Sequence, residues 1–241
     1  MPQIGKSIFT LLCLIALGLV VSVPARADVV YISPFVVQPS GQGVVPTVLT
    51  LQHSGNNTTE MGAVIRGNGV DVLLFPNPTG DVVSGVNSKT IQFSSLNTSA
   101  ANLGIFLDIV EPGNDGALTL TSLTLTAYTN NGMVLDIFNY TGGPLLLTET
   151  PGAGGGRSDH VFGLTGDQAA RLQAAFAANP DLRLGLAASF TGVAGGPEQF
   201  FFGARNVPQT PIPEPATMIL LGTGLAGVAA RVRRRRGVSR D

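Results

Sequence analysis

Two histidines, His53 and His160, are the residues best suited to acid–base chemistry, and Ser158 and Asp159 stand directly before the second. A serine, a histidine and a carboxylate are the groups that acyl-transfer enzymes combine. Adjacent side chains of an extended chain point to opposite faces, however, so these three cannot converge on one substrate. The chain also lacks the G-x-S-x-G, H-E-x-x-H, P-loop and dinucleotide-binding patterns. We therefore expect no catalytic residues, with both histidines in exposed loops.

A cation site is the second chemistry to consider. Asp108, Glu111, Asn114 and Asp115 gather in the segment "DIVEPGNDG", and hard cations such as Ca²⁺ prefer oxygen ligands. Their spacing matches no EF-hand, and Asn, Asp and Gly are equally typical of tight turns. A turn is therefore the favoured interpretation, calcium is the weaker alternative, and we expect no metal and no cofactor.

The distribution of charge argues against a nucleic-acid partner. Between Asp28 and Gln209 the chain has 13 acidic and six basic residues, a formal net charge of −7, and most remaining basic residues follow residue 230. An acidic region without a basic patch repels nucleic acid. The single cysteine, Cys13, lies near the N-terminus, so the rest of the chain can form no disulfide framework.

The central region alternates short apolar runs with turn residues, a pattern that predicts an all-β protein. The predicted strands are 29–37, 46–53, 62–67, 70–75, 89–95, 103–110, 117–129, 133–140, 182–191 and 198–205. The segment "TLTAYTNNGMVLDIF" is the clearest hairpin, because Asn131 and Gly132 suit a tight turn. We expect an antiparallel β-sandwich, jelly-roll-like, over residues 28–207.

One segment breaks the strand pattern and predicts a helix over 166–178. Thr165 and Gln168 have the spacing of a capping box, and Asn179-Pro180 stops the helix. We expect this helix to be inserted between strands and to cover one end of the sandwich.

The N-terminus has the features of a secretory signal peptide, residues 1–27. Lys6 precedes an apolar run over 8–21, and Ala25 and Ala27 form an A-x-A cleavage site. The alternative is a retained membrane anchor, for which a run of this length is short.

The C-terminus combines four features in a fixed order. A Pro-rich segment over 208–215 contains Pro213, Glu214 and Pro215, and an uncharged run over 216–230 follows. A basic tail over 231–241 ends the chain, and its arginines are Arg231, Arg233, Arg234, Arg235, Arg236 and Arg240. The run predicts a short transmembrane helix, and the arginines place the tail in the cytoplasm and the domain outside it.

This C-terminus resembles that of the PEP-CTERM sorting proteins of Gram-negative bacteria. The resemblance covers about the last 30 residues of the chain. It implies recognition by exosortase, a membrane-embedded transpeptidase-like enzyme that removes the tail near the motif. The alternative is a stiff linker in front of a simple anchor. Proteins with this signal are linked to exopolysaccharide and biofilms.

We therefore expect an exported, non-enzymatic protein that is transiently anchored on the periplasmic side of the inner membrane. Exosortase would release it to the envelope or the extracellular matrix, where exopolysaccharide is a candidate partner. Only three tyrosines and no tryptophan are available for sugar stacking. Two alternatives stay open: a hydrolase that uses a pair of carboxylates, and a structural protein that self-associates through sheet edges.

Overall fold

The computed structural model describes residues 29–37, 47–53, 57–74, 81–110, 116–149 and 158–205, with the side chains of 33–37 left aside. The chain divides into two units, Met1–Arg205 and Asn206–Asp241, and all described residues belong to the first. In this part of the chain, no helix is long and apolar enough to cross a membrane. The predicted transmembrane stretch, 216–230, lies outside the described residues.

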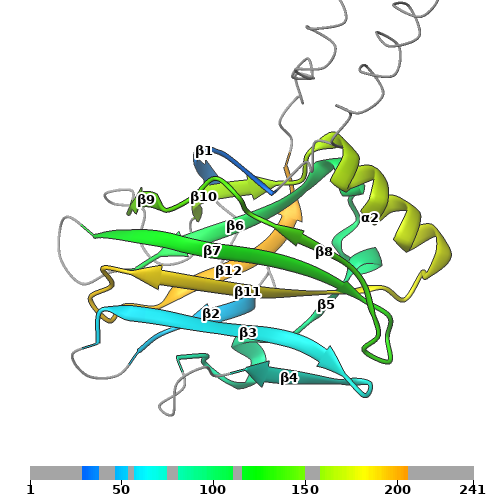
Figure 1. Ribbon diagram of the computed structural model, residues 1–241, viewed down its shortest axis with the longest axis horizontal. Coiled ribbons are helices and arrows are strands. Elements are labelled where there is room, and N and C mark those ends of the chain that lie inside the picture. Colours follow the sequence, from blue (N-terminus) through cyan, green and yellow to red (C-terminus); the bar gives the residue numbers. More distant parts are fainter. Residues whose placement is uncertain are drawn as a thin grey trace, which may run out of the picture. The chain divides into compact units, whose positions relative to one another are not determined.

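The described part of the chain folds into two antiparallel sheets with one α-helix (Figure 1), which confirms the prediction of an antiparallel β protein. The five-stranded sheet has the order β1-β10-β6-β12-β2, and its strands are β1 (Val30–Val37), β10 (Ser158–Gly163), β6 (Leu103–Ile109), β12 (Glu198–Ala204) and β2 (Thr47–Leu51). The seven-stranded sheet has the order β4-β3-β11-β7-β8, with β5 beside β11 and β9 beside β7. Its strands are β4 (Val70–Leu74), β3 (Thr59–Gly67), β11 (Arg183–Thr191), β7 (Ala117–Tyr128), β8 (Val134–Asn139), β5 (Ile91–Gln92) and β9 (Leu145–Thr148). Three short 3-10 helices are η1 (Gly85–Asn87), η2 (Phe93–Leu96) and η3 (Ala100–Asn102), and the α-helix is α2 (Gly166–Ala178).

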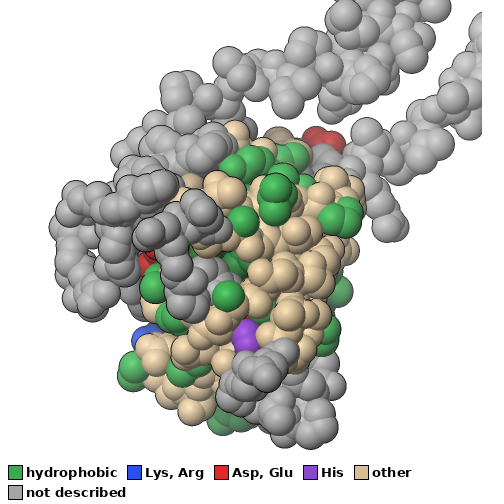
Figure 2. All heavy atoms as spheres, turned by 90° about the vertical axis from the view of Figure 1, so that its left-hand side faces the viewer, with side chains coloured by type: hydrophobic (Ala, Val, Ile, Leu, Met, Phe, Trp, Pro, Cys, Tyr) green, Lys and Arg blue, Asp and Glu red, His purple; other side chains and the backbone are tan. Residues whose placement is uncertain are grey.

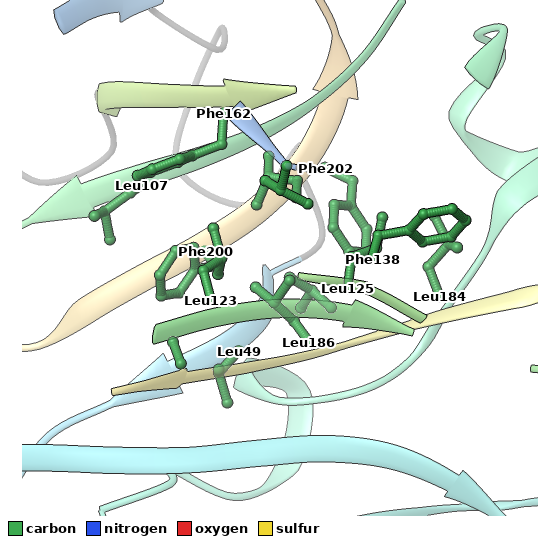
Figure 3. Packing of buried hydrophobic residues seen from close by; sticks show 14 of the residues in the cluster. Leu49, Leu107, Leu123, Leu125, Phe138, Phe162, Leu184, Leu186, Phe200 and Phe202 are labelled. Atoms are coloured by element: carbon green, nitrogen blue, oxygen red, sulfur yellow. The ribbon is translucent and has the colours of Figure 1, made fainter. Parts of the chain in front are cut away.

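A single hydrophobic core joins the two sheets (Figure 3). Leu107, Phe162 and Phe200 enter it from the five-stranded sheet, and Leu125 and Leu186 enter it from the seven-stranded sheet. The rings of Phe190 and Phe200, one from each sheet, stack with their centroids 5.8 Å apart. Burial of these side chains is the main force that holds the sheets together.

The two sheets differ in how much of their outer face solvent reaches. Every residue of β6 is buried, and a second cluster of Phe106, Val161 and Phe201 lies on the side of the five-stranded sheet away from the core. Along β7 and β11, by contrast, buried residues alternate with half-buried and exposed ones. The seven-stranded sheet thus has an open outer face.

Two hairpins of the seven-stranded sheet meet at their tips. Asn68 and Gly69 both have positive φ, 50° and 79°, the conformation that a two-residue turn between β3 and β4 requires. The predicted β7–β8 hairpin is confirmed, and its Gly132 has a φ of 97°. A Cβ on Gly132 would lie 2.7 Å from the carbonyl oxygen of Arg66, so the close approach of the hairpins requires glycine there.

The helix α2 begins and ends at the predicted residues. The predicted capping box of Thr165 and Gln168 is present. Gln168 Oε1 accepts from the Thr165 N–H at 3.4 Å, whereas the approach of Thr165 Oγ1 to the helix falls short of a hydrogen bond. The helix packs through Leu172 on the core, and its Phe176 meets Phe93 edge to face at 4.9 Å. It thereby covers core residues at one end of the sheets (Figure 1).

One strand prediction needs correction, and two strands were missed. Of the predicted strand 89–95, only two residues form β5. On that side of β11, β3 pairs with residues 186–191 and leaves only 183–185, of which Arg183 and Leu184 pair with β5. The strands β9 and β10 were not predicted at all.

Candidate functional site

Most of the site residues predicted from sequence lie outside the described residues. These are Ala25, Ala27, Glu111, Asn114, Asp115, Pro213, Glu214, Pro215, Arg231, Arg233, Arg234, Arg235 and Arg236. Of the calcium candidates, only Asp108 is described, and it is buried in β6. Within the described ranges, no three His, Cys, Asp or Glu side chains gather as a metal site.

The expectation of exposed loop histidines was wrong for both residues. His160 lies in β10 with its residue only 3% exposed. Its Nε2 is 3.0 Å from the carbonyl oxygen of Thr148, so Nε2 must carry the proton. Tyr31 then donates its hydroxyl proton to Nδ1 over 3.0 Å. Burial lowers the pKa of His160, so the ring is neutral at pH 7. Because both ring nitrogens are hydrogen-bonded, neither is available as a base.

His53 is buried beside a carboxylate. Glu60 Oε1 accepts from the backbone N–H of His53 at 2.8 Å and lies 2.9 Å from its Nδ1. Both side chains are almost fully buried, at 3% and 0% exposure. Gly195, with a φ of 97°, closes over the ring, since a Cβ there would lie 3.4 Å from His53 Cε1. The pair links His53, two residues beyond β2 of one sheet, to Glu60 in β3 of the other.

The residues beside His160 do not form a catalytic set with it. In β10, Phe162 belongs to the main core and Val161 to the second cluster, so successive side chains face opposite sides. Asp159 therefore faces away from His160, and its Oδ2 accepts from the backbone N–H of Ile109 at 2.8 Å. Ser158, Asp159 and His160 are thus residues of a buried strand whose polar groups interact with other parts of the protein.

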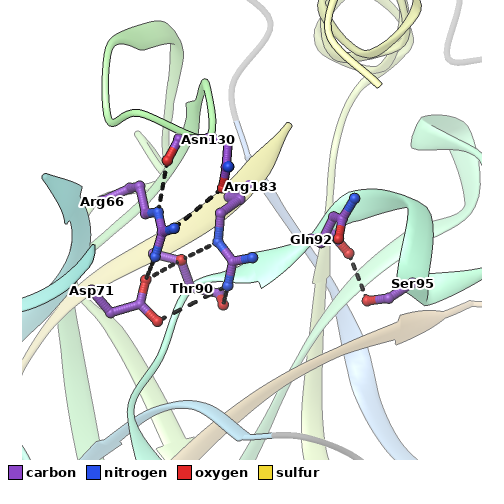
Figure 4. A network of polar contacts seen from close by, with 7 residues as sticks. All are labelled: Arg66, Asp71, Thr90, Gln92, Ser95, Asn130 and Arg183. Carbon is purple, nitrogen blue, oxygen red and sulfur yellow. Dashed lines mark hydrogen bonds and ion pairs between the residues drawn. The ribbon is translucent and has the colours of Figure 1, made fainter. Parts of the chain in front are cut away.

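The largest described polar network lies where the two hairpins meet (Figure 4). Arg66 donates from Nη1 to Asp71 Oδ1 at 3.0 Å, and from Nε and Nη2 to the main-chain and side-chain oxygens of Asn130 at 3.0 and 3.2 Å. Thr90 donates to the same Asp71 oxygen and accepts from Arg183 Nε at 2.7 Å.

This network holds two guanidinium groups around one carboxylate. The pKa of Arg183 is lowered chiefly by burial and also by the charge of Arg66, whereas the charge of Asp71 raises it. The cluster joins the β3–β4 hairpin, the β7–β8 hairpin, the first residue of β11 and Thr90, which directly precedes β5. Its donors are largely occupied within the protein. The network of Arg66, Asp71, Thr90, Asn130 and Arg183, here called the clamp, therefore has a structural role.

Arg205 marks the end of the first unit. It is 4% exposed, and its Nη2 donates to the carbonyl oxygens of Ala101 and Leu164 at 2.9 and 3.1 Å. Burial lowers its pKa. Its backbone N–H also donates to the carbonyl oxygen of Asn102 at 2.8 Å. The end of β12 is thus fastened to two neighbouring segments immediately before the second unit begins at Asn206.

The comparisons with known proteins bear on that second unit. The family model of the PEP-CTERM protein-sorting motif matches residues 211–235. The chain carries a PEP-CTERM protein-sorting motif. Searches of curated proteins and of solved structures found no match.

The PEP-CTERM motif includes the predicted Pro213-Glu214-Pro215 triplet, the apolar run and most of the arginine block. It implies export, transient anchoring in the membrane and an exosortase as the general kind of partner. The matched residues form a small part of the chain and lie outside the residues that the structure describes. The activity of the domain must therefore be argued from its own residues.

Proposed function

We propose that this protein is a non-enzymatic component of the cell envelope or extracellular matrix, delivered there by exosortase. In this proposal residues 1–27 are a cleaved signal peptide and residues 216–230 hold the chain in the inner membrane until processing. The exported domain is a jelly-roll-like sandwich. The observation that carries the proposal is the match of the PEP-CTERM motif to residues 211–235.

The non-enzymatic part is supported by the state of the candidate catalytic groups. Both ring nitrogens of His160 are hydrogen-bonded, and Asp159 accepts a hydrogen bond from a backbone N–H. Glu60 holds both the backbone and the ring of His53. A general base needs an accessible lone pair near a substrate, and these groups are buried inside strands or strand ends.

An association with exopolysaccharide would rest on polar contacts. The described phenylalanines and tyrosines are all buried or half-buried, so stacking platforms for sugar rings are not offered by this part of the chain. Neutral hydroxyl and amide side chains on the open sheet face are the groups that could contact a polysaccharide there.

Mass spectrometry of the intact protein from its native host tests the proposal. We expect an N-terminus at Asp28 and a C-terminus near the Pro213-Glu214-Pro215 triplet, with or without an attached group. A protein that keeps residues 1–27, or that keeps its tail through Asp241, would contradict the processing that the proposal requires.

A further inference from the structure

Val29, the second residue after the proposed cleavage bond between Ala27 and Asp28, is built into the fold. It is 1% exposed and belongs to the main core. Its N–H donates to the carbonyl oxygen of Asn139 at 2.9 Å, and it forms a parallel bridge with Tyr140. The described fold therefore starts almost directly after that bond.

The next residues hold this segment in place by pairing with β10 (Figure 1). Val30 and Tyr31 stand opposite Gly163 and Phe162 in the antiparallel register of β1 and β10. The ring of Tyr31 lies 5.3 Å from that of Phe162, and its hydroxyl group donates to His160 Nδ1 at 3.0 Å. Both the backbone and the side chain of Tyr31 thus bind β1 to its neighbour.

We propose that the pairing of β1 with β10 shields the bond between Ala27 and Asp28, so that signal peptidase must cut the chain before β1 pairs. This inference rests on the proposed function, in which residues 1–27 are a cleaved signal peptide. A protease binds residues on both sides of the bond it cuts, and burial and hydrogen bonding of that backbone decide whether the bond can be reached. Val29 and Val30 cannot enter an enzyme's cleft while they belong to the sheet.

The reaction is the hydrolysis of one peptide bond. Water adds to the carbonyl carbon of Ala27, which becomes a carboxylate, and the nitrogen of Asp28 leaves as the new α-amino group. No group of β1 takes part in these steps, so the strand acts on access alone. A folded precursor reacts only through molecules in which β1 has opened, and its rate follows the population of that open form.

Charge repulsion is the other means by which a folded domain could exclude the enzyme. Val29–Ile32 carry no charge. Figure 2 shows few charged side chains on the described surface of the face in view. The burial and pairing of β1 are therefore the better explanation for a shielded bond, and they predict that loosening this strand alone restores cleavage.

Cleavage of the purified full-length precursor by signal peptidase in detergent tests the inference. The reference is Leu125→Asp, which places a charge in the core and unfolds the domain, as circular dichroism would verify. We expect the folded wild-type precursor to be cut at least about 100-fold more slowly than this reference. If the unfolded reference is not cut after Ala27, the proposed signal peptide is wrong, and the inference fails with it.

Two matched variants test whether β1 is the shield. Tyr31→Phe removes the hydroxyl group that donates to His160 and should speed cleavage of the folded precursor about fivefold. Tyr128→Phe removes a hydroxyl group from a buried residue of β7 and should change the rate by less than about twofold. A folded wild-type precursor that is cut as fast as Leu125→Asp would overturn the inference alone. So would a Tyr31→Phe precursor that is cut no faster than the Tyr128→Phe precursor.

Discussion

His160 shows how tertiary contacts decide the chemistry of a single side chain. Thr148 fixes the proton on Nε2, Tyr31 occupies Nδ1, and burial lowers the pKa of the ring. A free histidine titrates at about 6.5. The folded state therefore holds the neutral ring at pH values where the unfolded chain already binds a proton.

This difference predicts an acid-sensitive contribution to stability. The contribution is complete above about pH 6.5 and is lost as the pH falls below it, with a slope of up to about 1.4 kcal/mol per pH unit. His160→Gln, which cannot take up a proton, should remove that part of the slope. Urea unfolding of both proteins at several pH values between about 5 and 7.5 measures it; parallel curves would show that His160 is not protonated on unfolding.

The clamp around Asp71 predicts a second effect at the scale of single residues. Asp71→Asn leaves Arg66 and Arg183 close together without their shared carboxylate, and we expect a loss of about 1–3 kcal/mol in unfolding free energy. Arg66 and Asp71 have side chains that are 13% and 25% exposed.

The matched control is Asp136→Asn, which breaks the ion pair with Arg171 of α2. Arg171 is 50% exposed, so this pair should contribute at most about 1 kcal/mol. Chemical denaturation of the three proteins compares them. Equal losses in the two variants would show that the clamp has no special role.

At the scale of elements, helix α2 offers a test of its capping box. Because Thr165 Oγ1 makes no hydrogen bond, Thr165→Ala should change the unfolding free energy by less than the ~1 kcal/mol usual for such a cap. Gln168→Ala removes the acceptor of the Thr165 N–H and should cost about 1 kcal/mol. A larger loss for Thr165→Ala than for Gln168→Ala in thermal or urea unfolding would reverse this assignment.

The elements whose residues are close together in the sequence were predicted correctly. The alternation in β7 and β8 and the glycine between them predicted their hairpin, and the spacing of Thr165 and Gln168 predicted α2. Asn68-Gly69, which stands between two predicted strands, is the dipeptide most typical of a tight hairpin turn. A hairpin was nevertheless not predicted there.

Elements specified by distant partners were missed. Strand β10 begins with Ser158, Asp159 and His160 after a glycine-rich stretch, which resembles a loop. Its polar groups can be buried because Ile109, Tyr31 and Thr148 satisfy them, and those partners are far away in the sequence. The His53–Glu60 pair was missed for another reason: the two residues are only seven apart, but they belong to segments of different sheets, and no sequence pattern indicates that their side chains meet.

At the scale of the whole molecule, the end of the first unit at Arg205 predicts an autonomous domain. A fragment from Asp28 to Gln209 keeps both sheets, α2 and the contacts of Arg205. It should unfold in one cooperative transition and show a circular dichroism spectrum dominated by β structure. Loss of the cooperative transition would mean that residues beyond 209 contribute to the fold.

The sorting motif gives the last prediction, because its parts should fail in different ways. Glu214 is the only charge in the Pro-Glu-Pro triplet, so Glu214→Ala should slow removal of the tail by exosortase while insertion into the membrane continues. Deletion of 231–236 should instead let the apolar run pass into the periplasm, since moving each arginine into hydrocarbon costs about 2.5 kcal/mol or more. Immunoblots of membrane and periplasmic fractions would separate the two outcomes, and a host without exosortase should keep the full tail. If Glu214→Ala and the wild-type protein are processed at the same rate in the native host, the triplet is a spacer, and recognition must lie in the helix or the arginines.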